Sequence, residues 1–121
     1  MAAVYNFDPG DFLIFQLESG YALLRVLHVD GDPTDPTWHV AAYKDYFLDP
    51  EAADAALDHP DSLSIDTAHL ALTNHAFEST QVARLQNVLL AETDLAGYRS
   101  WKESETKEIH DRSIRLLLGL R

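Results

Sequence analysis

Residues 11–29 read DFLIFQLESGYALLRVLHV, and this stretch decides the fold. Two β-prone runs, 11–17 and 21–29, are separated by Glu18-Ser19-Gly20, which is the composition of a short hairpin with glycine at the position of positive φ. Both runs are nearly apolar on both faces. We therefore predict a central hairpin that is covered from each side.

The length and composition limit the class of protein. A chain of 121 residues fits one domain, so we take residues 1–121 as a single domain. The absence of cysteine excludes disulfides, thiolate metal sites and thiol catalysis. No apolar run approaches the ~20 residues of a membrane span, and the opening MAAVY shows no secretory signal. We expect a cytoplasmic protein with no membrane partner.

The acidic charge is concentrated in the first two-thirds of the chain. The net charge is −11; residues 1–80 carry fourteen acids against two bases, whereas residues 81–121 carry six acids and seven bases. Such a surface repels phosphate backbones, so we expect no nucleic-acid ligand. It favours a basic protein partner, although acidity that only maintains solubility remains the alternative interpretation.

The middle of the chain predicts a third strand followed by a helix. Residues 37–44 alternate, with Trp38, Val40 and Ala42 on one face and the intervening residues on the other. Residues 49–58 then form a helix, because Asp49 can cap it and Pro50 suits its first turn. The intervening loop 30–36, rich in aspartate and proline, is expected to be mobile.

The second half predicts two further strands and a long helix. Residues 68–73 alternate as a strand, 74–77 resemble a turn, and 80–85 fit a strand or the start of a helix, of which we choose the strand. From Thr93 onward the spacing is helical. Three acid-to-base pairs at i, i+4 would support one long helix: Glu103–Lys107, Glu108–Arg112 and Asp111–Arg115. Its apolar stripe, which includes Ile109, Leu116 and Leu120, would pack on the sheet or on a second copy of the chain.

These elements together predict an α+β fold. The expected architecture is a small curled antiparallel sheet of about five strands, similar in outline to an SH3-like barrel, with one short inserted helix and a C-terminal helical segment.

The histidines supply the one constellation that could bind a metal. His28 and His39 lie on neighbouring predicted strands, and His69 could join them from a fourth. A buried, hydrogen-bonded histidine on a strand is the commoner arrangement, so we assign no metal site and no cofactor. No catalytic motif and no glycine-rich phosphate loop is present, so we assign no catalytic residue.

An aromatic group lies beside an acidic helix and forms our predicted partner-binding surface. Aromatic anchors rimmed by acids are typical of a docking patch for a basic protein, although core packing is the commoner use of such rings. The set comprises Trp38, Tyr43, Asp45, Tyr46, Asp49, Glu51, Asp54 and Asp58.

Two stretches of the sequence resemble a known group of proteins. Gly10-Asp11 opens the first strand, Gly20-Tyr21 opens the second, and residues 69–74 are followed by Phe77. This pattern is similar to small bacterial β-barrel proteins of the toxin-immunity type. The resemblance implies an inhibitor that occludes a basic toxin domain.

The sequence thus favours a non-enzymatic, acidic protein-binding module. Two alternatives stay open: a small metal-dependent or otherwise uncharacterised enzyme that uses the strand histidines, and a self-associating module that dimerises through the C-terminal helix.

Overall fold

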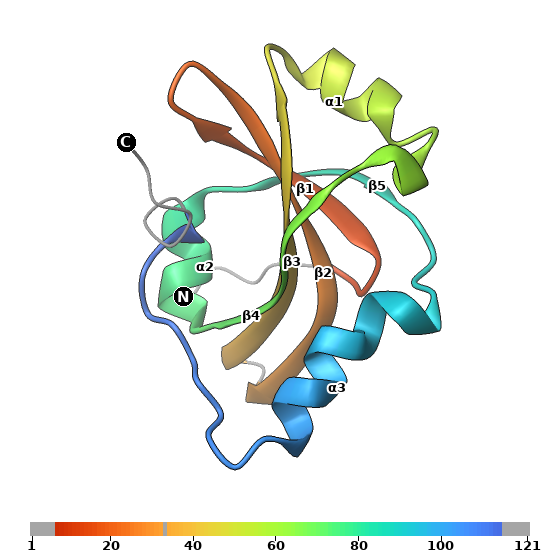
Figure 1. Cartoon of the computed structure of the whole chain (residues 1–121). Helices are drawn as coiled ribbons and strands as arrows, with labels where there is room; N and C mark the ends of the chain where they lie inside the picture. Colours follow the sequence, from red (N-terminus) through yellow and green to blue (C-terminus); the bar gives the residue numbers. More distant parts are fainter. Residues whose placement is uncertain (1–6, 33, 115–121) are drawn as a thin grey trace.

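The computed structural model describes residues 7–32 and 34–114, which contain one five-stranded antiparallel sheet of order β4-β3-β2-β1-β5 (Figure 1). The predicted hairpin β1–β2 and its neighbour β3 form an antiparallel meander, and β4 and β5 are the two edges. The sheet is not closed, because these edges do not pair within the described residues, so an SH3-like barrel is not confirmed. The strands are β1 Asp11–Leu17, β2 Gly20–Asp32, β3 Asp35–Phe47, β4 Ile65–Leu72 and β5 Ala83–Asn87.

Within residues 7–32 and 34–114, three α-helices and two short 3₁₀ turns connect or cover these strands, which agrees with the predicted α+β class. Helix α2 lies on one side of the sheet, and α1 and α3 lie on the other (Figure 1). Their bounds are α1 Pro50–Ala56, η1 Pro60–Ser62, α2 Asn74–Thr80, η2 Glu92–Leu95 and α3 Ala96–Glu103.

Each face of the sheet has its own apolar core, as the two-sided hairpin predicts. Alternate residues of one strand point to opposite faces, so Leu13 and Phe15 contact one core while Phe12 and Ile14 contact the other. The same alternation holds for β3, where Trp38, Val40 and Ala42 share the first core as predicted. This first core is closed by Phe77 of α2, and the second by Ala53, Leu57 and Tyr98.

The predicted start of α1 is confirmed in detail. Asp49 has extended backbone angles, and its carboxylate accepts a hydrogen bond from the amide of Ala52 at 2.8 Å. Pro50 occupies the first turn, where its missing N–H costs nothing.

The turn between β1 and β2 corrects the expected position of the glycine. Glu18, at φ 58°, has the positive φ, and Gly20 does not. Gly20 is needed for close packing instead: a Cβ there would lie 2.6 Å from the Phe47 carbonyl oxygen and 2.5 Å from the Tyr46 ring. The expected loop 30–36 is also shorter than predicted, since β2 and β3 stay paired out to Asp32 and Asp35.

The predicted turn at 74–77 is wrong, because helix α2 begins there. Thr73 caps it by accepting a hydrogen bond from the amide of Ala76 at 3.1 Å. Gln81 ends the helix in a left-handed conformation, so the fifth strand begins at Ala83 rather than residue 80.

The long C-terminal helix is also wrong. Helix α3 ends at Glu103, and an irregular segment with a bend at residues 105–106 then leads to the edge of β4, where His110 exchanges backbone hydrogen bonds with Ala71 and Thr73 at 2.8 and 2.9 Å. Backbone pairing with an open strand edge thus replaces the predicted helix at the pairs Glu103–Lys107 and Glu108–Arg112, whereas Arg115 of the third pair lies outside the described residues. Ile109 is 46% exposed, and the remainder of the stripe, Leu116 and Leu120, falls outside the described residues.

Candidate functional site

The predicted aromatic anchors divide into buried and exposed residues. Trp38 is 2% exposed, stacks on Phe77 with ring centroids 4.0 Å apart, and donates its indole N–H to Asn74 at 3.0 Å, so it serves the core. Tyr43 is 7% exposed and borders a cavity described below. Tyr46 is the exposed anchor at 45%, although its hydroxyl donates to the Leu17 carbonyl.

Three of the predicted acids also stabilise the fold. Asp49 caps α1, Asp45 accepts from the amide of Ser64 at 2.6 Å, and Asp54 accepts from the Gln86 side chain at 3.0 Å. Glu51 is exposed on α1, and Asp58 is exposed in the turn that follows this helix. The structure therefore keeps these acids together on one segment, residues 45–58, but uses some of them locally.

Leu48 is an exposed apolar residue that sequence reasoning missed. It is 80% exposed and immediately precedes the capping residue Asp49. A hydrophobic residue at this position usually packs against the first turns of the helix. The signal was therefore present in the sequence, but it pointed to packing rather than to an accessible surface.

The three strand histidines converge, as the sequence suggested. His28 and His39 are paired across β2 and β3, and His39 Nδ1 lies 2.9 Å from His69 Nε2 on β4. Asp30 joins them, with its two carboxylate oxygens 2.9 Å from His28 Nε2 and 3.0 Å from His39 Nε2. The result is a continuous histidine chain, defined here as His28, Asp30, His39 and His69.

The hydrogen bonds of the chain fix which ring nitrogens carry protons. An ionised carboxylate only accepts, so His39 Nε2 donates to Asp30. A neutral His39 then accepts at Nδ1 from His69 Nε2. Burial lowers the pKa of His39 more than the adjacent carboxylate raises it, which keeps the ring neutral.

The electrostatics of His69 and Asp30 fit this arrangement. Burial, together with the positive charge of His39 and His110 when protonated, lowers the pKa of His69 to about 4. Burial alone would raise the pKa of Asp30, but its contacts with His28 and His39 outweigh burial and lower it. The histidine chain therefore contains one carboxylate, Asp30, that forms hydrogen bonds with the rings of both His28 and His39.

Helix α3 covers the histidine chain with aromatic rings. Tyr98 and Trp101 each lie 4.7 Å from the His39 ring, measured between centroids. Gly97 allows this approach, because a Cβ there would lie 3.0 Å from the His69 Cβ. Tyr98 and Trp101 lie on one face of α3, and that face packs against the sheet of the same molecule.

The histidine chain does not have the form of a metal centre. The ring nitrogens that face one another or Asp30 form hydrogen bonds in pairs. The described residues hold no group of three or more histidine, cysteine or acidic side chains that could bind a metal ion.

A second polar cluster surrounds Arg25, for which the sequence predicts no function. Arg25 is 5% exposed on β2, donates from Nη2 to the carbonyls of Val88 and Leu89 at 2.7 and 3.1 Å, and pairs with Asp94 at 3.2 Å. Its guanidinium lies 4.7 Å from the centroid of the Phe12 ring. A lone cation in an apolar strand was the signal that could have identified it, since a buried charge needs partners.

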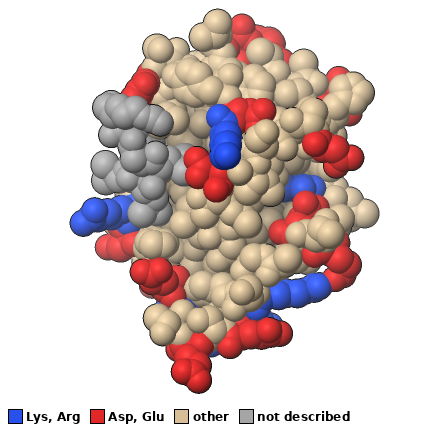
Figure 2. Space-filling model, viewed as in Figure 1, with Lys and Arg blue, Asp and Glu red and all other residues tan. Residues whose placement is uncertain are grey.

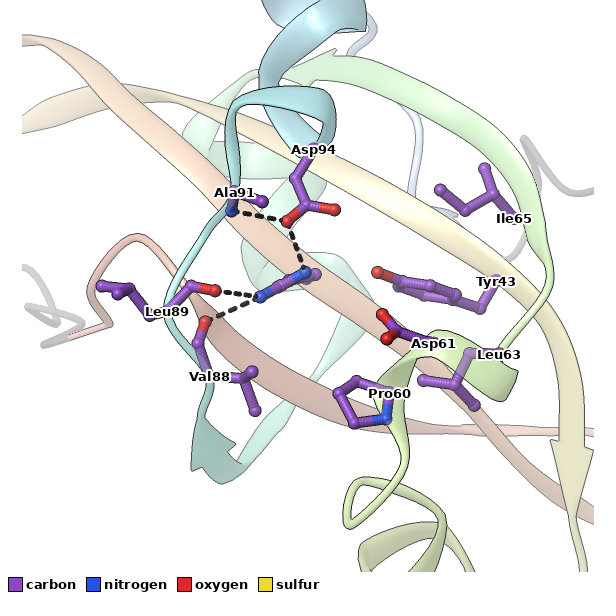
Figure 3. A pocket seen from close by; sticks show the side chains of 10 residues that line it. Tyr43, Pro60, Asp61, Leu63, Ile65, Val88, Leu89, Ala91 and Asp94 are labelled. Carbon is purple, nitrogen blue, oxygen red and sulfur yellow. Dashed lines mark hydrogen bonds and ion pairs between the residues drawn. The ribbon is translucent and has the colours of Figure 1, made fainter.

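A cavity of about 270 Å³ opens beside Arg25 (Figure 3). Figure 3 shows Tyr43 next to Asp61, with Asp94 on another part of the lining. Burial raises the pKa of the Tyr43 phenol despite the neighbouring Arg25 cation, so its hydroxyl stays protonated at neutral pH. Apolar side chains supply the other walls: Pro60, Leu63, Ile65, Val88, Leu89 and Ala91.

No helix within the described residues has the length and apolar character needed to cross a bilayer. Comparisons of the chain with protein-family models, with curated proteins and with solved structures found no match.

Proposed function

We propose that the protein is a non-enzymatic binding module whose acidic surface receives a basic protein, in the manner of an immunity protein that occludes a toxin. The observation that carries the proposal is segment 45–58, where exposed Tyr46 and Leu48 adjoin five acids. Apolar anchors with a charged rim are typical of protein interfaces. The proposal does not depend on a closed barrel.

The overall charge supports the choice of a basic partner. Acidic side chains are spread over the face seen in Figure 2, and few basic side chains lie among them. A field of this kind raises the association rate with a cationic protein, toward ~10⁸–10⁹ M⁻¹s⁻¹ at low salt. Because acids also lie outside segment 45–58, charge would steer the encounter and Tyr46 with Leu48 would fix its position.

The test compares two variants of equal net charge. The triple variant Glu51→Lys, Asp54→Lys, Asp58→Lys reverses the proposed surface, and the control Glu103→Lys, Glu105→Lys, Glu108→Lys reverses three acids near and after the end of α3. Each is used as bait in the lysate of the source organism, and captured proteins of high isoelectric point are quantified by mass spectrometry.

We expect the first variant to lose a specific basic protein that the wild type and the control variant both retain. The affinity of the purified pair, measured by calorimetry, should then fall by at least tenfold for the first variant and by less than threefold for the control. Equal losses from both variants would mean that net charge alone acts, and would remove segment 45–58 as the recognition surface.

A further inference from the structure

An exposed apolar rim borders the cavity beside Arg25. Leu89 is 90% exposed and Ile65 is 45% exposed, and both line the cavity together with Leu63. Single exposed apolar residues are common on protein surfaces, but apolar residues gathered around a hollow are typical of a binding site. The volume, about 270 Å³, is just below the ~300–1,000 Å³ of ligand pockets and suits one side chain of another protein.

The positive charge of Arg25 is not available to an occupant of this cavity. The Arg25 side chain is 6% exposed, its Nη1 pairs with Asp94, and its Nη2 donates to two backbone carbonyls. The Tyr43 hydroxyl faces the same guanidinium. These contacts already compensate the buried cation, so an anion that entered the cavity would find no free positive charge.

The accessible charges of the lining are carboxylates. Asp61 is exposed, and its carboxylate forms no hydrogen bond or ion pair within residues 7–32 and 34–114. The Asp94 side chain is 27% exposed and uses Oδ2 for both Arg25 and the amide of Ala91. The lining therefore favours a cationic occupant, because such a group meets two carboxylates and a guanidinium that is already paired.

The cavity adjoins segment 45–58, the proposed recognition surface. Asp45 accepts a hydrogen bond from the amide of Ser64, which lies between the lining residues Leu63 and Ile65. Ala53 of α1 and Leu63 also pack in the second core, on the same face of the sheet. A protein that covers segment 45–58 therefore lies beside the cavity.

We propose that this cavity receives one lysine side chain of the basic partner, an inference that rests on the proposed function. The four-carbon stem contacts the apolar rim, and the ammonium lies between Asp61 and Asp94. These carboxylates occupy separate parts of the lining (Figure 3). A compact ammonium with three donors suits them better than the planar fork of arginine, which matches a single carboxylate.

The test titrates short probes into the purified full chain while ¹H–¹⁵N NMR follows the backbone amides of Leu63, Ile65 and Leu89. Blocked Gly-Lys-Gly carries the proposed side chain, and blocked Gly-norleucine-Gly keeps its stem without the ammonium. We expect the lysine peptide to shift these signals saturably and the norleucine peptide to bind about tenfold more weakly, the effect of one hydrogen bond to a charged group. Tighter binding of blocked Gly-Arg-Gly would overturn the choice of lysine.

Two variants of equal net charge separate the cavity from the general acidity of the surface. Asp61→Asn removes a carboxylate of the lining. Asp66→Asn is the control, because Asp66 is exposed on β4 and strand alternation points it away from the side of Ile65. Binding of the lysine peptide should weaken about fivefold in the first variant and stay within about twofold in the second. Equal weakening in both variants would overturn the proposal.

A free amine distinguishes the source of the cation. n-Butylammonium has the stem and charge of the lysine side chain without a peptide backbone. Tighter binding of the peptide supports a docking role, whereas tighter binding of n-butylammonium overturns it in favour of a small-molecule site.

The proposal is also overturned if Gly-Lys-Gly shifts none of the three amides up to its solubility limit. Such a failure leaves the proposed function intact, because none of these titrations alters segment 45–58 or uses the captured protein. A capture experiment that yields no basic protein would instead remove the proposed function and leave the titration result unchanged.

Discussion

Gly20 is enclosed so tightly that no side chain fits. A Cβ there would meet the Phe47 carbonyl oxygen at 2.6 Å, and backbone of a paired strand cannot move aside as a flexible side chain can. We expect Gly20→Ala to lower the free energy of unfolding by about 1–3 kcal/mol, the usual cost of overpacking. Urea denaturation of Gly20→Ala and of the control variant Ser19→Ala, at an exposed position, measures this loss of stability. Equal urea midpoints for the two variants would contradict the prediction, because they would show that the hairpin backbone moves to accommodate the added methyl group.

Thr80 links two distant segments through one buried hydroxyl. It donates to the Ala76 carbonyl at 3.0 Å and accepts from the amide of Ile114 at 3.1 Å. Thr80→Val keeps the shape but leaves that amide unsatisfied, so we expect a loss of about 1–3 kcal/mol in the free energy of unfolding. Thr80→Ser retains the hydroxyl and should lose less. If denaturation ranks the serine variant as the less stable, packing of the methyl group outweighs the hydrogen bond.

At the scale of elements, what the sequence could predict depended on how local the cause was. Helix α1 was predictable because Asp49 and Pro50 act within one turn, and the hairpin because its apolar runs leave no solvent face. The conformation of residues 104–113 was not predictable, because the acid-to-base pairs favour a helix locally while the backbone can instead bond to the open edge of β4. That edge exists only after the sheet has formed. The histidine chain was half predictable: strand pairing placed the rings, but Asp30 appeared to belong to a loop.

The histidine chain makes the attachment of α3 sensitive to acid. The unfolded chain gains protons on His39 and His69 near pH 6.5, while the folded pKa values are lower, about 4 for His69. Stability should therefore fall as the pH drops from about 6.5 toward about 4, and the lowered pKa of Asp30 acts in the same direction at the acid end. His28, Tyr98 and His110 are the other ionisable groups that face the chain.

We expect the wild type to lose roughly 2 kcal/mol between pH 7 and pH 4.5 through these groups. His69→Gln, which keeps a polar partner for His39 without titrating, should lose distinctly less. Urea denaturation at each pH gives the difference, with the variant His75→Gln, at an exposed position of α2, as the control. Parallel pH profiles for His69→Gln and the wild type would contradict this account.

The whole molecule carries a self-repulsion that only screening or a cationic partner can relieve. The sequence has twenty acidic residues against nine lysines and arginines, so the net repulsion is screened by added salt. The ion pairs Arg25–Asp94 and Arg84–Asp11 each include a buried side chain, so salt weakens these attractions much less. Raising the ionic strength from 0.01 to 0.15 M shortens the screening length from ~30 to ~8 Å, so the urea midpoint of the wild type should rise.

The Glu51→Lys, Asp54→Lys, Asp58→Lys variant changes the net charge from −11 to −5, since each reversal adds two charges. Its midpoint should depend less on salt, and so should that of the equally charged variant at residues 103, 105 and 108. A wild-type midpoint that falls with salt would mean that specific ion pairs outweigh repulsion, and the acidic field would then be weaker than steering a basic partner requires.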